Sequence, residues 1–371
     1  MFKLSLRFGG GMINLVLLVT VMALGSSCEK DSARPAAWQA LTPFPGDKTF
    51  FSAAADGNRY FLFFGIAQHD PNGFEDKYRN DIWMYDADRN EWSEKNPYDG
   101  AGRFNATAFT IDGDIYIIGG RGIRGPYPQE EMDLNEFLKY DPTSDTWTSL
   151  DPFPGQPRSG ALAFVVDGVA YFGLGSSDGV PMRDLWQYNA TTGGWRQLVD
   201  FPGTLPTQFL SPSFDGENVN SKLINFVFDS RIVLITGANW EEPESWTFDT
   251  STEEWIQNEP PVFEDEETEK LYCVRSGAAS IVYGGEGYVT LGVHVNRETQ
   301  HSDVSRYNEA NNSWKETDTS PGASHSAAFS FVYKDGIIIG TEYNRYNRSR
   351  TSVDADPYEL WLYKPGLVSN D

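Results

Sequence analysis

Apolar and polar residues alternate along most of the chain in short runs, joined in pairs by tight-turn residues. Residues 102–120 read GRFNATAFTIDGDIYIIGG, and residues 157–175 read PRSGALAFVVDGVAYFGLG. In each segment two apolar runs flank an Asp-Gly dipeptide, which favours a two-residue hairpin loop. The same pattern, with Asp-Gly, Asp-Ser or Gly-Gly at the turn, recurs in residues 50–65, 222–237, 274–292 and 324–340. The pattern therefore predicts six β-hairpins.

An aromatic pair follows five of these hairpins at a fixed spacing of seven residues. The pairs are Tyr85 and Trp92, Tyr140 and Trp147, Tyr188 and Trp195, Phe248 and Trp255, and Tyr307 and Trp314. The spacing indicates two more strands per unit, one with the Tyr or Phe and one with the Trp. Ten of the 11 Trp residues occupy repeat positions, so we expect them in the core, and Trp240 is the exception.

Units of four short strands, with glycines ending the second strand and a Tyr…Trp pair after it, resemble the Kelch family of β-propellers. The resemblance covers residues 36–364, although only the second unit keeps a full doublet, Gly119-Gly120. It implies an all-β, six-bladed Kelch β-propeller. Packing the sheets face to face around an axis buries both faces of each and leaves only short exposed edges.

The opening of the chain supplies a strand that the last unit lacks. The sixth unit ends YELWLYKPG (358–366) with no Trp strand after it. Residues 36–46, AAWQALTPFPG, are similar in sequence to two segments that contain Trp strands. These segments are DTWTSLDPFPG (145–155) and GGWRQLVDFPG (193–203). We expect the strand at Trp38 to pair with the last strand of the sixth blade and close the ring.

The residues before this strand are typical of a lipoprotein signal. Lys3 and Arg7 precede the apolar run 13–25, and Cys28 follows small residues. This resembles bacterial lipoproteins of the Bacteroides–Flavobacterium type, although Gly25 stands where Leu is usual. We expect a signal peptide (1–27), a tether (28–35) and a propeller (36–371), with a lipid on Cys28 anchoring the protein in the outer membrane of the bacterial cell envelope. The alternative is a secreted protein with a spare cysteine.

Charge and motifs argue against several classes of function. The formal charge is −24, and −26 without Lys3 and Arg7, which disfavours nucleic acid as a partner. No phosphate loop or metal motif is present, and we expect no cofactor and no metal. Galactose oxidase is also a Kelch propeller, but its Cys–Tyr crosslink has no counterpart here because Cys273 directly follows Tyr272.

Candidate ligand residues gather at one end of the predicted ring, which we call the mouth, where each first strand begins and each second strand ends. The resemblance places there Arg103, Arg158, Arg275 and His325, with Asn220 or Ser221 and Asp47 or Lys48 from the remaining blades. The loops between second and third strands add Arg121, Trp240 and Tyr343. Because the Arg side chain suits carboxylates, we expect a binding module for an anionic glycan or an acidic peptide or protein. The alternative role of these arginines is pairing with acids of neighbouring loops.

An enzymatic function is the second hypothesis. Bacterial sialic acid mutarotases resemble six-bladed Kelch rings, and mutarotation needs an acid and a base on opposite sides of a sugar. Glu241, Glu342 and His325 are the candidates for these roles. No local motif selects them, so this hypothesis rests on analogy of fold.

Overall fold

The computed structural model describes eleven parts of the chain, and all of them are built from β-strands and loops. The parts are residues 37–67, 78–124, 130–205, 223–236, 244–259, 262–263, 277–294, 299–300, 302–321, 328–341 and 358–366. They contain a single 3₁₀ turn (Glu309–Asn311) and no α-helix. None of their helical residues forms a helix long and apolar enough to cross a membrane. The all-β prediction is confirmed.

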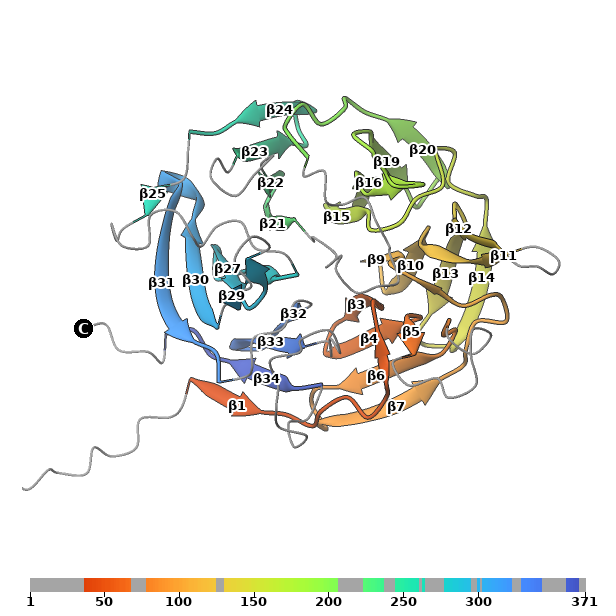
Figure 1. Cartoon of the computed structure of the whole chain (residues 1–371), viewed down its shortest axis with the longest axis horizontal. Helices are drawn as coiled ribbons and strands as arrows, with labels where there is room; N and C mark the ends of the chain where they lie inside the picture. Colours follow the sequence, from red (N-terminus) through yellow and green to blue (C-terminus); the bar gives the residue numbers. More distant parts are fainter. Residues whose placement is uncertain are drawn as a thin grey trace, which may run out of the picture. The chain divides into compact units, whose positions relative to one another are not determined.

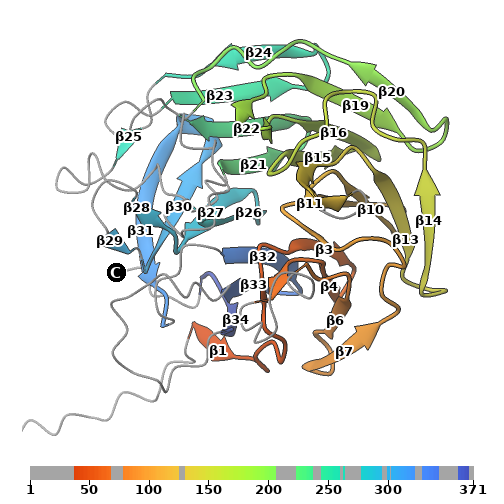
Figure 2. The ribbon, with the colours of Figure 1, turned by 45° about the vertical axis from the view of Figure 1, so that its right-hand side comes forward.

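The described residues form six antiparallel sheets of four main strands, which we call blades, placed around a common axis (Figures 1 and 2). The first blade holds β3 (Ser52–Asp56), β4 (Arg59–Phe63), β6 (Ile82–Asp86) and β7 (Glu91–Lys95). The second holds β9 (Thr107–Ile111), β10 (Asp114–Ile118), β13 (Phe137–Asp141) and β14 (Thr146–Leu150). The third holds β15 (Leu162–Val166), β16 (Val169–Gly173), β19 (Leu185–Asn189) and β20 (Gly194–Gln197).

The remaining three blades follow the same order. The fourth holds β21 (Ile224–Phe228), β22 (Arg231–Thr236), β23 (Glu244–Asp249) and β24 (Glu254–Gln257). The fifth holds β26 (Ala279–Tyr283), β27 (Glu286–Thr290), β30 (Asp303–Asn308) and β31 (Ser313–Thr319), with β25 (Val262–Phe263) parallel to β31. The sixth holds β32 (Ala328–Tyr333), β33 (Gly336–Thr341), β34 (Leu360–Tyr363) and β1 (Trp38–Ala40).

Strand β1 completes the last blade, as the sequence predicts. It pairs antiparallel with β34, with Trp38 opposite Tyr363 and Ala40 opposite Trp361. The Trp38 and Tyr363 rings stack with centroids 4.6 Å apart. Main-chain hydrogen bonds from Leu41 N to Leu360 O and from Lys364 N to Ala37 O, both 2.8 Å, extend the pairing at each end. Strands from the two ends of the described chain therefore share one sheet.

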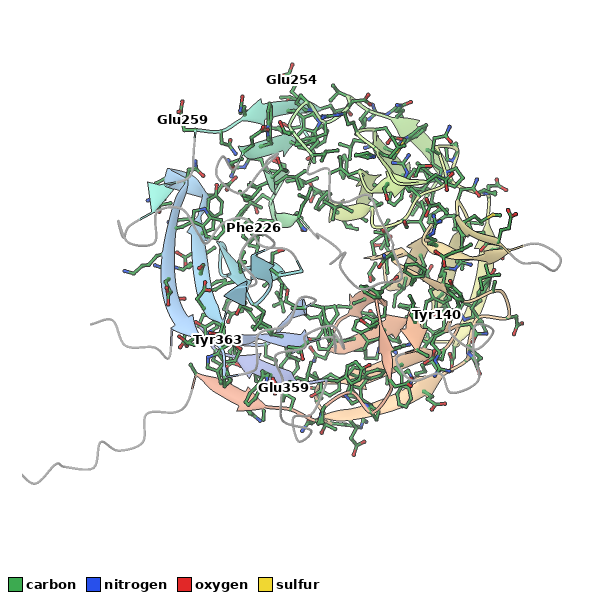
Figure 3. All side chains as sticks on the ribbon, in the orientation of Figure 1. Tyr140, Phe226, Glu254, Glu259, Glu359 and Tyr363 are labelled. Carbon is green, nitrogen blue, oxygen red and sulfur yellow. The ribbon has the colours of Figure 1, made fainter. Side chains whose placement is uncertain are left out.

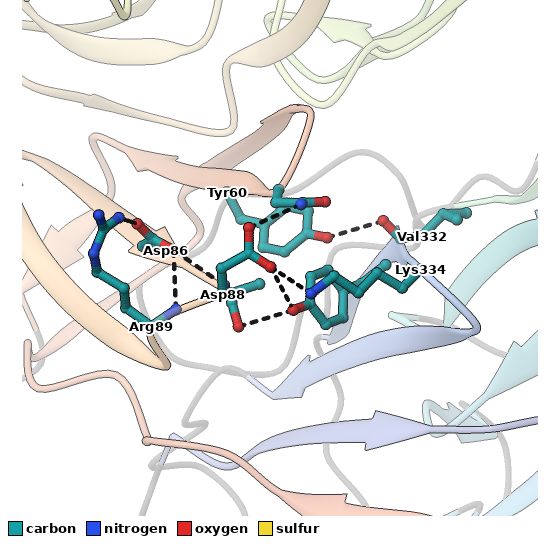
Figure 4. Close-up of polar contacts among 9 residues, drawn as sticks. Tyr60, Asp86, Asp88, Arg89, Val332 and Lys334 are labelled. Atoms are coloured by element: carbon teal, nitrogen blue, oxygen red, sulfur yellow. Dashed lines mark hydrogen bonds and ion pairs between the residues drawn. The ribbon is translucent and has the colours of Figure 1, made fainter.

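Polar contacts join the sixth blade to the first at the end opposite the mouth (Figure 4). The Asp88 carboxylate accepts hydrogen bonds from Tyr333 Oη (2.9 Å), Lys334 Nζ (2.5 Å) and Asn58 Nδ2 (3.0 Å). Tyr60 Oη donates to Val332 O at 2.9 Å. The two blades that meet where the ring closes are thus linked directly.

The hairpins turn where the sequence places its turn residues. Asp112 and Gly113 have φ of 52° and 86°, and Asp167 and Gly168 have 50° and 75°. Positive φ at both central residues is the type I′ geometry, which matches the twist of the flanking strands. Gly tolerates this conformation without a steric penalty, and Asp tolerates it better than most residues. Turn chemistry therefore fixes the pairing of these first and second strands.

The Phe of the repeated Phe-Pro-Gly sequence fills the space between neighbouring blades as a plug. Phe153 follows the last strand of the second blade and packs against Trp186 and Trp195 of the third, at centroid distances of 5.3 and 5.1 Å. Phe44 packs in the same way against Trp83 and Trp92. Phe201 packs in the same way against Trp246 and Trp255. Among the repeat Trp residues, Trp314 is buried and the others are half-buried. The Trp residues therefore pack in the interfaces between blades.

A second link between blades centres on the tyrosines of the third strands. Tyr140, which is labelled in Figure 3, packs against Phe61 and Phe63 of the first blade. Its hydroxyl donates to Asp145 Oδ1 at 2.6 Å. The same Asp145 oxygen accepts from Asn96 N at 3.1 Å. Tyr140 therefore connects the second blade to the segment that leaves the first.

We expect Phe153→Ala to lower the free energy of unfolding by about 3–5 kcal/mol, because the substitution removes a buried ring and leaves a cavity. Phe153 is 1% exposed. Urea unfolding followed by Trp fluorescence measures the loss. Val332→Ala is the control, since Val332 is 46% exposed and its truncation changes stability by no more than about 0.5 kcal/mol. Equal losses in the two variants would contradict the plug.

Additional short β-strands pair with one another at the mouth. They are β2 (Lys48–Thr49) with β5 (Ile66–Ala67), the three-stranded sheet β8 (Arg103–Phe104), β11 (Arg121–Arg124) and β12 (Glu130–Asp133), β17 (Ser176–Ser177) with β18 (Val180–Pro181), and β28 (Val293–His294) with β29 (Thr299–Gln300). The residues that precede the first strands and those that follow the second strands therefore meet at one end.

Candidate functional site

Three cations at the mouth are buried inside the protein and paired with acids. Lys48, Arg103 and Arg158 precede the first strands of the first three blades and are 1%, 0% and 1% exposed. Their partners are Asp81, Glu136 and Asp184, each of which directly precedes the third strand of the same blade. We call these three pairs the latches. Each one joins the start of a first strand to the start of the third strand in its own blade.

The Arg158 latch is the best formed. Arg158 Nη1 and Nη2 donate to Asp184 Oδ1 and Oδ2, both at 2.7 Å, which is the bidentate geometry that suits Arg and carboxylate. Its Nε donates to Gln156 O at 3.1 Å, and Nη1 also reaches Leu174 O at 3.3 Å. Burial alone would raise the pKa of Asp184, but the hydrogen bonds and charge of Arg158 hold it below its ordinary value.

Aromatic rings complete each latch. The Arg158 guanidinium lies 5.1 Å from the Phe153 centroid and 5.7 Å from that of Phe172. Arg103 has Phe64 at 5.1 Å and Tyr98 at 5.5 Å, and Lys48 has Phe44 at 6.0 Å. Cation–π contacts of this kind are stronger when desolvated. The aromatic of each preceding linker therefore serves two purposes, as a plug between blades and as a floor for the latch cation.

We expected Arg103 and Arg158 to present their guanidinium groups to a ligand, and the structure does not show this. Both lie at the predicted end of the blades, but their side chains are buried and bonded within the protein. The alternative role, pairing with acids of neighbouring loops, describes what the structure contains. The sequence left open whether Asp47 or Lys48 stands at the mouth position of the first blade. Lys48 occupies the latch position, and Asp47 pairs with Arg79 at 3.0 Å.

Arg121 lies in a more open setting. Its Nε donates to Glu131 Oε1 at 2.7 Å, and its Nη1 is 3.2 Å from Asp133 Oδ1 and 3.7 Å from Asp178 Oδ1. Tyr78 donates to the other oxygen of Glu131. We call Tyr78, Arg121, Glu131, Asp133 and Asp178 the mouth cluster. It joins the first three blades, and the Asp178 side chain is 83% exposed.

The comparisons with known proteins agree with this architecture. Residues 27–226, more than half of the chain, match the family model described as the KLHDC2/KLHL20/DRC7 Kelch-repeats domain. The chain belongs to the Kelch-repeat family. Kelch-like protein 25 of Xenopus tropicalis is 22% identical over 293 residues, covering 78% of this chain and 44% of that protein. The chain thus matches less than half the length of that relative.

Two further comparisons extend over more of the Kelch-repeat chain. Kelch-like protein terF of Aspergillus terreus is 23% identical over 345 residues, covering 86% of this chain and 68% of that protein. The solved structure of YjhT superposes with a TM-score of 0.60 and 14% identity, covering 87% of this chain and 95% of that one. At that identity the superposition shows the fold alone.

Most of the other predicted site residues lie outside the described residues. These are Arg275, His325, Trp240 and Tyr343 as ligand contacts, Glu241, Glu342 and His325 as catalytic groups, and Cys28 as the lipid attachment point. Their roles stay predictions. In the part of the chain that the structure describes, no three His, Cys, Asp or Glu side chains are grouped to hold a metal ion.

The acids of the latches are functional residues that sequence reasoning missed, although the sequence carries a signal for them. An acid stands two residues before the third-strand Trp in four blades, and its carboxylate accepts the indole N–H. The pairs are Asp81 with Trp83 (2.8 Å), Asp184 with Trp186 (2.6 Å), Glu244 with Trp246 (2.8 Å) and Glu359 with Trp361 (3.4 Å). The motif acid-x-Trp therefore marks two of the three latch acids, Asp81 and Asp184, but not Glu136, which is followed two residues later by Leu138.

The Lys48 latch predicts a pH dependence of stability. Burial lowers the pKa of Lys48 from 10.5 to about 8, despite the opposing charge of Asp81. Between pH 8 and 10.5 Lys48 carries a proton in the unfolded chain but not in the folded chain, so the free energy of unfolding rises with pH. Below pH 8 Lys48 is protonated in both states, and its contribution to the free energy of unfolding does not change with pH. We expect wild type to gain up to about 3 kcal/mol relative to Lys48→Met between pH 8 and 10.5. Parallel urea-unfolding profiles of the two proteins would contradict this.

Proposed function

We propose that this Kelch propeller is a ligand-binding module held at the bacterial cell envelope by a lipid on Cys28, and that its ligand docks at the mouth. The observation that carries the proposal is the mouth cluster, where polar side chains from three blades gather around the half-buried Arg121. Loops carried on a rigid scaffold are the usual place for binding residues. The relatives include several Kelch-like proteins, which fits a module of this kind.

Arg121 is the described residue proposed to contact an anionic ligand. Its side chain is 17% exposed, whereas Arg103 and Arg158 are fully buried. A ligand carboxylate can replace Asp178, whose 3.7 Å contact is the longest that Arg121 makes with an acid in the mouth cluster. The ligand class remains the one expected from the sequence, an anionic glycan or an acidic peptide.

The experiment is a titration of the full chain with an acidic peptide and with a sialylated oligosaccharide. We expect Arg121→Ala to weaken binding about tenfold to a hundredfold, because it removes a hydrogen bond to a charged group. Arg231→Ala is the matched control, since Arg231 pairs with Glu309 at the end opposite the mouth. Equal binding by both variants would contradict the proposed site. Catalysed exchange of sugar anomers would instead favour the mutarotase alternative.

The lipid anchor is tested separately. We expect wild type to incorporate radiolabelled palmitate in a bacterial host and to sediment with membranes, and Cys28→Ser to do neither. A Cys28→Ser protein that is still labelled and membrane-bound would contradict attachment at this residue.

A further inference from the structure

The residue before the latch acid holds the linker that leaves its own blade. In the first blade Asn80 Nδ2 donates to Tyr98 O at 2.8 Å, and Tyr98 N donates back to Asn80 O at 3.0 Å. In the second blade Asn135 and Phe153 exchange the same two bonds, at 3.5 and 2.9 Å. We call each such pair of bonds a brace. An uncharged amide side chain is therefore sufficient to form it.

The third blade has an arginine at this position. Arg183 directly precedes the latch acid Asp184, and its Nη1 donates to Phe201 O at 3.0 Å and to Gly203 O. Phe201 N donates back to Arg183 O at 2.8 Å, as in the other two braces. Because Asn forms the brace in the first two blades, the brace alone does not explain a guanidinium group here.

The other edge of the Arg183 guanidinium is open. Arg183 is an exposed residue, and none of the described residues accepts a hydrogen bond from its Nε or Nη2. Of the arginines whose side chains the structure describes, it is the one without an ion pair. The charge of Arg183 helps to lower the pKa of Glu244, but that carboxylate accepts from Thr204 and Trp246. Nε and Nη2 form an edge with which Arg can bind a carboxylate through two parallel bonds.

Arg183 lies at the mouth on a well-fixed segment. It follows the hairpin of β17 and β18, whose turn residue Asp178 belongs to the mouth cluster. Met182 N donates to Gly175 O at 2.9 Å, which ties the residue before Arg183 to the segment that follows β16. The two carbonyl bonds of Nη1 hold the guanidinium in place. A ligand that binds its open edge therefore has little side-chain freedom to remove.

We propose that the Nε and Nη2 edge of Arg183 is a second subsite of the mouth, which binds a carboxylate of the ligand. This inference rests on the proposed function, because it assigns a further contact to the ligand that meets Arg121. Two guanidinium groups on neighbouring blades select a ligand with at least two carboxylates. An acidic peptide and an oligosaccharide with two sialic acid residues present this same chemistry.

The experiment titrates the full chain with four probes by calorimetry in about 150 mM salt, which screens long-range repulsion by the acidic chain. Two multivalent probes, acetyl-tetraglutamate amide and a sialic acid dimer, distinguish the peptide from the glycan. Their monovalent counterparts are acetyl-glutamate amide and sialic acid. We expect at least one multivalent probe to bind wild type at least about tenfold more tightly than its counterpart. Equal binding within both pairs overturns the proposal.

Arg183→Asn removes the open edge and keeps a side chain that forms the brace in two other blades. We expect it to weaken binding of the multivalent probe at least about tenfold, because it removes hydrogen bonds to a charged group, and to leave the unfolding midpoint unchanged. Arg89→Asn is the matched control, since Arg89 is 72% exposed and pairs with Asp86 at the end opposite the mouth. Equal affinity of Arg183→Asn and wild type overturns the proposal.

Chemical modification tests the subsite in the wild-type protein. Phenylglyoxal reacts with exposed guanidinium groups, so it should modify Arg183 and Arg89 and spare the buried Arg103 and Arg158, as seen by peptide mapping. The multivalent probe should protect Arg183 but not Arg89. An Arg183 that stays unmodified in the free protein, or that the bound probe leaves unprotected, overturns the proposal.

These measurements separate failure of the subsite from failure of the proposed function. If the probes bind through Arg121, while Arg183→Asn binds like wild type and Arg183 is not protected, the proposed function stands and this inference fails. If none of the four probes binds, both fail.

Discussion

Arg158→Ala is expected to lower the free energy of unfolding by about 3–5 kcal/mol, because it leaves the Asp184 carboxylate without its cation in a site closed to water. The Arg158 side chain is 1% exposed and that of Asp184 is 13% exposed. Denaturant unfolding at pH 7 measures the loss. It should be smaller at pH 2, where protonation removes the unpaired charge, since burial raises the pKa of Asp184 and the hydrogen bonds and charge of Arg158 are the main opposing cause that the substitution removes.

Arg196→Ala provides the matched control. Arg196 also pairs with a carboxylate, that of Glu253, but the two side chains are 52% and 40% exposed. Exposed pairs contribute about 0–1 kcal/mol. If Arg158→Ala costs no more than Arg196→Ala and instead abolishes binding of an acidic ligand, then Arg158 is a ligand residue and the latch interpretation is wrong.

Deletion of residues 37–46 is expected to cost more than any single substitution considered above. It removes the Trp38 ring stacked on Tyr363 and the Phe44 plug between the sixth and first blades. Each loss is worth about 3–5 kcal/mol. The sum is comparable with the total stability of a typical domain, about 5–15 kcal/mol. We expect a chain that is largely unfolded or associates through the exposed edge of β34.

Size-exclusion chromatography and circular dichroism of the deletion variant measure this outcome. Gln39→Ala is the control, because Gln39 is an exposed residue of the same strand and its truncation should leave a folded monomer. A deletion variant that stays monomeric and unfolds at the wild-type midpoint would show that β1 contributes nothing to closure.

The strand pattern could be predicted from sequence because its determinants are local. Alternation, turn residues such as Asp112-Gly113 and the seven-residue Tyr…Trp spacing all lie within one blade. Closure could also be predicted, because Trp38 lies in a phrase that two complete blades repeat. These features can be recognised without knowing which side chains contact one another between blades.

The fate of the mouth arginines could not be predicted in the same way. The acid that pairs with Arg103 is 33 residues away, and the acid that pairs with Arg158 is 26 residues away, so several acids compete in the sequence. Asp47 and Lys48 are adjacent, and only the three-dimensional arrangement assigns Lys48 to the latch. The repeated phrase around Phe153 was recognisable as a repeat, but its contacts with the next blade and with Arg158 were not.

An engineered disulfide between β1 and β34 shows whether β1 closes the last sheet. Ala40 and Trp361 are directly opposite in β1 and β34, at a position flanked by the Leu41–Leu360 hydrogen bond, so cysteines there have suitable geometry. In a full chain that also carries Cys28→Ser and Cys273→Ser, oxidised Ala40→Cys, Trp361→Cys should form an intramolecular bond between the two segments, seen by peptide mapping. Ala40→Cys with Val332→Cys should not. Absence of the first bond in folded, monomeric protein would contradict the account.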